Sequence, residues 1–228
     1  MKKEMEEFLV GSYFGFYGEN NAEKCIKKAY SDMQRRIPYR FSCSDLEKMK
    51  KEGKIEEAKR YNELKNDFKR DITNLIVKET KNKIVPRSII YKAYFNANDV
   101  KYRELFSDEN NVEFYYGLAQ KWVNMSLKYL WLFGNENIIK EDLDVPLDDF
   151  IIRAIRIEPD NENVKYGLGL DCVDEKLKWS TLDNCVVYSN IQKSIKDEVM
   201  KRKIFDSAIE WENAAWLEQA RINAIHDG

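Results

Sequence analysis

The sequence predicts a mostly α-helical protein: a single helical domain over residues 1–228, with two lobes formed roughly by residues 1–110 and 111–228. Of the 228 residues, 43% are hydrophobic and 13% are aromatic, which is enough to build a core. Only four prolines and nine glycines are available for turns, and this favours long helices over a many-stranded sandwich. Apolar residues also recur at helical spacing along most of the chain. We therefore expect at most a small β-hairpin beside the helices.

The N-terminal half is expected to contain four helices. A serine and acidic residues at 42–47 begin the second of them, a long charged stretch interrupted at Gly53, and Pro86 permits the third. The expected helices cover residues 21–36, 46–83, 87–96 and 98–106. A polar loop over residues 107–111 then leads to the centre of the chain. Before these helices, the glycine–aromatic segment 11–18 is expected either to pack its rings on the core as a loop or to act as a lid that stacks on a base.

Residues 114–133 predict a helix that is buried on nearly all sides. Apolar residues occupy almost its whole circumference, and a helix that is apolar all round is normally a buried one. Lys121 and Lys128 lie seven residues apart on one line of this helix. Because burial disfavours a charged ammonium, such a lysine is expected to reach a carboxylate or to line a cavity where its amine does chemistry. We expect Trp122 and Leu130 to be buried and the protein to have an interior site.

The C-terminal half begins with Asp148, which is expected to cap the helix that follows it. Its short carboxylate can accept hydrogen bonds from free backbone N–H groups and suits the positive end of the helix dipole. Residues 159–161 indicate a turn, residues 164–173 are the best candidate for a β-hairpin, and residues 179–183 resemble the entry to a helix. The last two helices are expected near residues 184–202 and 206–224.

The charge and the cysteine and histidine content exclude several classes of function. The net charge is −2 and the pI is near 5.8, so no global positive field concentrates nucleic acid. Two basic runs, residues 34–36 with Arg40 and residues 201–203, more often mark solvated surface than phosphate sites. The four cysteines form no C-x-x-C pair and the only histidine is His226, so we expect no metal site and no cofactor.

The sequence also predicts where the protein resides. The sequence has no signal peptide and no apolar run long enough to span a bilayer. We therefore expect a cytoplasmic protein with reduced thiols that does not enter the membrane. An enzyme of this composition would depend on lysine and carboxylate chemistry. The sequence leaves the oligomeric state open.

Two features together resemble the helix-hairpin-helix DNA glycosylase superfamily. These are the apolar helix that carries Lys121 and the sequence Pro146-Leu147-Asp148 that opens the next helix. The resemblance is strongest to the archaeal 8-oxoguanine DNA glycosylase branch, which also has a long insertion between the two motifs. It covers residues 113–153. It implies a glycosylase-like architecture in which Lys121 is the amine nucleophile and Asp148 is the carboxylate that activates it.

The resemblance also implies a mechanism and a partner. DNA would be the partner, and a nucleotide would be drawn from the strand into a cleft where its sugar meets Lys121, as in DNA repair or defence. Aromatic rings would form the walls of the cleft, although each ring equally suits the core, and amides would read base edges, although they equally suit helix caps. The candidate substrate-binding residues are Gln120, Trp122, Asn124, Lys128, Tyr129, Trp179 and Tyr188.

Two other functions are compatible with the same residues. In the first, a noncatalytic module uses Lys121 to hold the phosphate of a nucleotide or of a small signalling molecule. In the second, the chain is a helical protein–protein adaptor, and Lys121 forms a structural ion pair with an acidic residue. The observation that separates these hypotheses is whether the Lys121 amine and the Asp148 carboxylate converge on one solvent-connected pocket that is large enough for a base.

Overall fold

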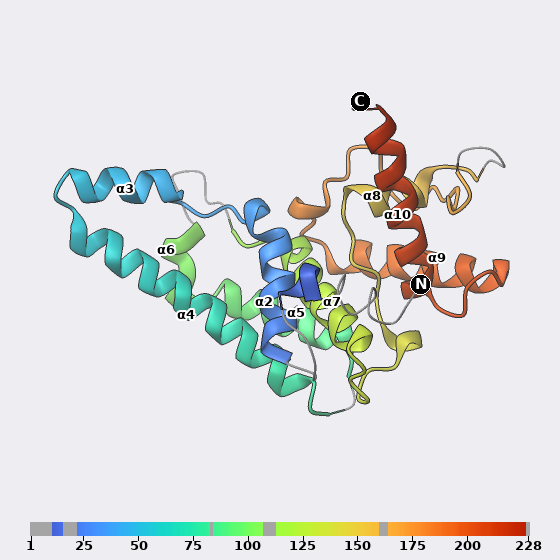
Figure 1. The fold of residues 1–228 in the computed structure, drawn as a ribbon, viewed down its shortest axis with the longest axis horizontal. Coiled ribbons are helices and arrows are strands. Elements are labelled where there is room, and N and C mark those ends of the chain that lie inside the picture. The colour runs from blue at the N-terminus through green and yellow to red at the C-terminus, as the bar shows by residue number, and fades with distance from the viewer. Residues whose placement is uncertain (1–10, 16–21, 83, 107–112, 160–163, 227–228) are drawn as a thin grey trace.

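The computed structural model describes residues 11–15, 22–82, 84–106, 113–159 and 164–226. Within these ranges the protein consists of α-helices, short 3-10 helices and connecting segments, without a strand (Figure 1). The prediction of a mostly α-helical protein is therefore confirmed for this part of the chain. The expected loop at 107–111 lies outside the described residues, as do positions 16–18 of the glycine–aromatic segment and positions 160 and 161 of the expected turn.

The N-terminal half follows the predicted helices closely. Ser42 caps the helix that follows it by accepting from the Asp45 N–H, while Asp45 accepts from the Ser42 N–H. Gly53 adopts a φ of +85°, which separates the two charged helices as expected. The elements are α2 (Ala22–Met33), η1 (Gln34–Arg36), α3 (Cys43–Lys51), α4 (Ile55–Glu79), α5 (Pro86–Ala97), η2 (Val100–Tyr102) and α6 (Arg103–Phe106).

Helix α7 (Tyr116–Leu132) occupies the centre of the molecule (Figure 1). It packs against α2 and α5, and all of its residues from Tyr116 to Leu130 are buried. Trp122 and Leu130 are among them, which confirms the prediction made from the missing polar side of this helix. Because α7 is enclosed on every side, any charged side chain on it must find a partner inside the protein.

The C-terminal half surrounds the other side of α7. Its elements are η3 (Lys140–Asp142), α8 (Asp149–Arg156), η4 (Trp179–Thr181), α9 (Cys185–Arg202) and α10 (Ala208–His226). Helix α10 packs on both α8 and α9, and η4 contacts α7. In Figure 1 these helices lie on the opposite side of α7 from α3 and α4.

The segment expected to form a β-hairpin is irregular over residues 164–173. Two of its backbone N–H groups donate to Glu218 of α10, and others pair with the end of α8, because a helix leaves its last carbonyl groups without partners. Leu168 donates to the Ala154 carbonyl over 2.9 Å, and Leu170 donates to the Ile155 carbonyl over 2.9 Å. The segment therefore caps α8 and needs no strand partner.

Candidate site at the start of helix α8

The start of α7 is fixed by a close backbone contact with η4. A β-carbon at Gly117 would lie 1.7 Å from the carbonyl oxygen of Trp179, so no other residue fits this position. The Gly117 N–H also donates to the Leu182 carbonyl over 2.7 Å. Helix α7 is thereby held at a defined position along η4, and the lysines further along it are held with it.

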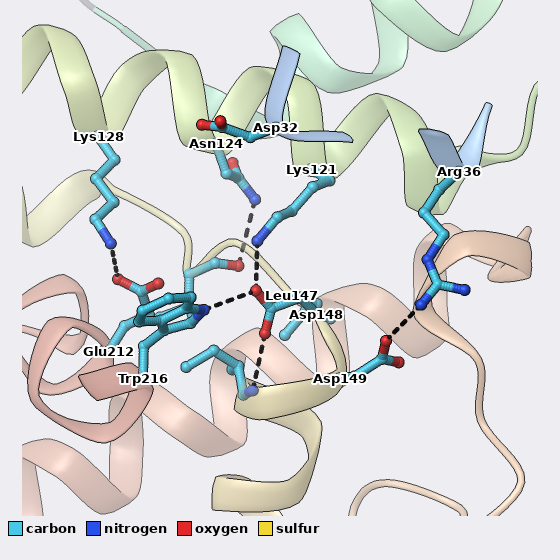
Figure 2. Close-up of polar contacts among 12 residues, drawn as sticks. Asp32, Arg36, Lys121, Asn124, Lys128, Leu147, Asp148, Asp149, Glu212 and Trp216 are labelled. Carbon is cyan, nitrogen blue, oxygen red and sulfur yellow. Dashed lines mark hydrogen bonds and ion pairs between the residues drawn. The ribbon is translucent and has the colours of Figure 1, made fainter. Parts of the chain in front are cut away.

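Lys121 lies one turn into α7 and reaches the residue that caps α8. Its Nζ donates to Oδ2 of Asp148 over 2.8 Å, and only 7% of Lys121 is exposed. The other carboxylate oxygen of Asp148 accepts from the Ile151 N–H over 2.9 Å, which confirms that Asp148 is the N-terminal cap of α8. One carboxylate therefore joins the lysine to the positive end of a helix (Figure 2).

The buried segment before Asp148 is held by the side chains of two glutamines. Gln120 donates to the Leu147 carbonyl over 3.0 Å and accepts from the Leu147 N–H over 3.1 Å. Gln192 of α9 donates to the Val145 carbonyl over 2.7 Å and accepts from the Val145 N–H over 2.8 Å. These four hydrogen bonds satisfy a buried, extended backbone and position Asp148 opposite Lys121.

Lys128 makes a second buried ion pair on the same face of α7. Its Nζ lies 2.5 Å from Oε2 of Glu212 on α10, and Glu212 is 1% exposed. Figure 2 shows both lysines pointing from α7 toward the same side, each onto a carboxylate. The side chain of Trp216, one turn after Glu212, lies between the two pairs.

Trp216 is the most exposed member of this group. Its indole N–H donates to Oδ2 of Asp148 over 3.2 Å, and its ring packs edge-on against Phe150 with centroids 5.3 Å apart. The residue is 37% exposed although it touches a buried carboxylate. It therefore forms a boundary between the Lys121–Asp148 pair and the surface, and a planar ligand can reach its ring.

The two carboxylates differ in their protonation behaviour. Burial on its own raises the pKa of Asp148, but Lys121 and the N–H groups of Ile151 and Trp216 outweigh this and hold that pKa below its ordinary value. Burial also raises the pKa of Glu212, and here the attraction of Lys128 does not cancel it. Asp148 is consequently ionised at neutral pH, ready to balance a positive charge beside it.

The other residues predicted for substrate binding are engaged within the protein. Asn124 is buried and donates to the hydroxyl of Tyr188 over 2.8 Å, and Tyr188 donates to Asp144. Tyr129 is buried and donates to Asp32 over 2.6 Å. Gln120, Trp122 and Trp179 are likewise buried. The structure brings Lys121 and Asp148 together and places Lys128 beside them, while the predicted aromatic walls lie in the core.

Glu212 and Trp216 were missed by the sequence reasoning, although a signal for them exists. The buried residues Ala208, Trp211, Ala215 and Gln219 define one stripe of α10, and Glu212 lies within it. A charged residue on a buried stripe needs a partner, and the unpaired lysines of the central helix were available. The role of Gln192 carried no such signal.

The predicted basic runs make local contacts. Arg36 lies 3.1 Å from Asp149 at the start of α8, and both side chains are exposed. Arg202 pairs with Glu198 and donates to the carbonyls of Gly167 and Leu168 over 2.7 Å each. Arg36 is therefore the exposed cation beside the candidate site, whereas Arg202 holds the segment that caps α8.

The comparisons with known proteins leave the site to be interpreted by its chemistry. No protein-family model matches the chain, and neither a curated protein nor a solved structure matches it. None of the described helices combines the length and the apolar composition that crossing a bilayer requires. Two observations therefore bear on function. One is the geometry of the Lys121–Asp148 and Lys128–Glu212 pairs, and the other is the short sequence resemblance.

Proposed function

We propose that the protein is a DNA glycosylase that excises a damaged base with Lys121 as its nucleophile. The observation that carries this proposal is the 2.8 Å contact between the Lys121 amine and the Asp148 carboxylate at the first turn of α8. The two residues are 27 positions apart, and they are the same two that the resemblance to helix-hairpin-helix glycosylases designates as nucleophile and activating carboxylate. The resemblance to the archaeal branch makes 8-oxoguanine the first substrate to test.

The chemistry follows from an amine beside a fixed anion. The nitrogen of neutral Lys121 attacks C1′ of the deoxyribose as the bond from C1′ to the base breaks, and the electron pair leaves with the base, which takes up a proton. Positive charge develops on the sugar during this step, and ionised Asp148 stabilises it. The nitrogen bound to C1′ then carries two protons. One goes to the departing base and the other to the ring oxygen as the sugar ring opens, which leaves a Schiff base between Lys121 and the sugar.

The neighbours of the pair fit the handling of a base. The exposed ring of Trp216 offers a stacking surface directly beside Asp148. Glu212 and Lys128 lie next to that ring but are buried and paired with each other, so they join α10 to α7 and leave the contact with a base to Trp216. Arg36, exposed beside the start of α8, suits a backbone phosphate.

Borohydride trapping tests the proposal. The protein is incubated with duplex DNA that contains 8-oxoguanine or an abasic site, and borohydride is added, because a reduced Schiff base cannot hydrolyse. We expect a covalent adduct with the native protein and with Lys78→Gln, which alters an exposed lysine of α4. We expect none with Lys121→Gln. Asp148→Asn keeps a capping side chain and should slow trapping by about 100-fold or more.

Two results would overturn the proposal. One is the absence of an adduct across a panel of oxidised, alkylated and abasic DNA substrates. The other is an adduct that persists in Lys121→Gln, which would assign the Schiff base to another amine. Circular dichroism of each variant establishes that a lost adduct does not reflect a lost fold.

A further inference from the structure

A pocket with both polar and apolar lining lies between α2 and α4, away from the Lys121–Asp148 pair. Its volume is about 490 Å³, which falls in the usual range for small-molecule sites. Trp122 and Tyr30, both buried, contribute rings to it. Trp122 follows Lys121 in the chain, but its indole N–H donates to the Ile26 carbonyl of α2, so it faces the other side of α7. The pocket is therefore separate from the proposed catalytic site.

One face of α4 supplies most of the polar lining. The lining positions are spaced by three, four, seven and eight residues, so they lie together on one side of the helix. They are Asn66, Lys69, Arg70, Thr73 and Asn74. The opposite wall comes from Glu23 and Lys27 on α2. Figure 1 shows α2 lying across α4 in this region.

The lining carries an excess of positive charge. Three cations, Lys27, Lys69 and Arg70, face one anion, Glu23, which gives a net charge of 3 − 1 = +2. Lys27 is paired with Glu23 over 3.2 Å, and Arg70 is paired with Asp67 over 2.6 Å. Lys69 has no carboxylate partner among the described residues, and its Nζ lies 5.0 Å from the centre of the Tyr30 ring. An anion that enters the pocket thus finds one half-buried ammonium available to it.

The protonation of Lys69 agrees with this arrangement. Burial lowers the pKa of Lys69, and the nearby Lys65 lowers it further. A bound anion would reverse both effects, because it would favour the charged ammonium. Binding of an anion would therefore offset the repulsion between the ammonium groups of Lys65 and Lys69.

Other hydrogen-bonding groups line the pocket with this ammonium. Thr73 is largely buried, and its side chain lines the pocket. Asn66 and Asn74 are exposed at the edge of the pocket, so their amides, the Thr73 hydroxyl and the Lys69 ammonium together offer hydrogen-bonding groups to a ligand that has a polar end.

We propose that this pocket binds a phosphorylated small molecule about the size of a nucleoside monophosphate, with its phosphate at Lys69 and its organic part against Tyr30 and Trp122. A compact ligand fits better than a nucleic acid strand for two reasons. The site is a hollow that holds a whole small molecule, and its surroundings include Glu23, Asp67 and Asp71, which repel an extended polyanion.

Isothermal titration calorimetry tests the proposal with inorganic phosphate, ribose 5-phosphate, the nucleoside monophosphates and adenosine. At least one phosphorylated compound should bind, and adenosine, which lacks the phosphate, should bind at least about 10-fold more weakly. Lys69→Gln should weaken the binding by about 10-fold or more, because it removes a charge-assisted hydrogen bond. Lys78→Gln, on the same helix but outside the pocket, should leave it unchanged. Lys121→Gln should leave it unchanged as well, which keeps this test independent of the glycosylase proposal.

Three results would overturn the proposal. The first is the absence of binding by every phosphorylated compound in the panel. The second is equal weakening by Lys69→Gln and Lys78→Gln, which would indicate attraction by the overall charge. The third is a single-stranded oligonucleotide that binds through Lys69 more tightly than any mononucleotide, which would make this face a strand-binding surface.

Discussion

Lys128→Met is predicted to destabilise the protein far more than Lys121→Met, and by an amount that depends on pH. Glu212 is 1% exposed, and Lys128 is the only hydrogen-bond donor that the described residues offer it. Methionine fills the space of the lysine stem but leaves the carboxylate buried without the cation that is hydrogen-bonded to it. Such a group avoids the cost of its charge by binding a proton. Protonating a glutamate at pH 7, with an ordinary pKa of about 4.3, costs about 1.4 kcal/mol per pH unit, or about 4 kcal/mol.

The direction of the pH effect follows from the same group. Burial already raises the pKa of Glu212, and removal of Lys128 raises it further. The folded variant then holds a proton that the unfolded chain releases, so its stability falls as the pH rises above the ordinary pKa of glutamate. The destabilisation should therefore shrink from about 4 kcal/mol at pH 7 to about 1 kcal/mol at pH 5.

Lys121→Met has a smaller expected effect, because its partner Asp148 keeps other hydrogen-bond donors. Asp148 keeps the N–H groups of Ile151 and Trp216, and 18% of its side chain is exposed. Only one charge-assisted hydrogen bond is lost, so we expect a cost of about 1–2 kcal/mol. Without Lys121, burial raises the pKa of Asp148, but its two N–H donors oppose this, so the cost should change less with pH than the cost of Lys128→Met.

Denaturant titrations followed by tryptophan fluorescence, at pH 5 and at pH 7, measure both effects. Lys78→Met, on the exposed face of α4, is the matched control and should change the free energy of unfolding by less than about 0.5 kcal/mol. Equal losses for Lys121→Met and Lys128→Met, or a loss for Lys128→Met that does not change with pH, would refute the reasoning. A loss of 3–5 kcal/mol for Lys121→Met with unaltered DNA trapping would make the Lys121–Asp148 pair structural only.

Two further predictions concern backbone contact and buried polarity. Gly117→Ala should destabilise the protein by about 3 kcal/mol or more in the same titrations, because its β-carbon would overlap the Trp179 carbonyl. At Gly53 an added β-carbon meets open space, so Gly53→Ala should cost only about 1 kcal/mol, for its positive φ. Similar costs for the two variants would show that η4 can shift to accommodate the added carbon. Gln219 is fully buried, and neither atom of its amide has a hydrogen-bond partner within the described residues. Gln219→Met should therefore raise the free energy of unfolding by about 1–3 kcal/mol and raise the melting temperature with it. A lower melting temperature would indicate that an internal water is hydrogen-bonded to the amide.

Local signals in the sequence were sufficient for most of the helices. The apolar circumference of residues 114–133 predicted a buried central helix, and Gly53 and Pro86 marked helix boundaries that the structure confirms. Such signals depend only on residues within a few turns of each other. Residues 164–173 were the best candidate for a β-hairpin, and they form no strand because their partners lie on other elements. Their backbone partners include carbonyls at the end of α8, and local patterning does not reveal a partner on another element.

The candidate site was predictable in part. Lys121 and Asp148 were paired through the resemblance, and the capping role of Asp148 followed from its position before an apolar run. The contribution of α10 was not predicted, because Glu212 is 84 positions from Lys128 and no local pattern links them. Gln120 was expected at a base edge, but its amide is used by Leu147, a partner that only the folded chain brings near.

Gln192 and Gln120 together stand in for the neighbouring β-strand that the segment before Asp148 lacks. In a sheet, alternate residues exchange hydrogen bonds with the adjacent strand, and Val145 and Leu147 are alternate residues here. If the segment shifted by one residue relative to the two glutamines, four buried backbone groups would lose their hydrogen bonds, each at a cost of about 1–3 kcal/mol. The two glutamines thereby fix the position of Asp148 relative to α7 and α9. The first turn of α8 can then open without moving the Asp148 carboxylate away from Lys121.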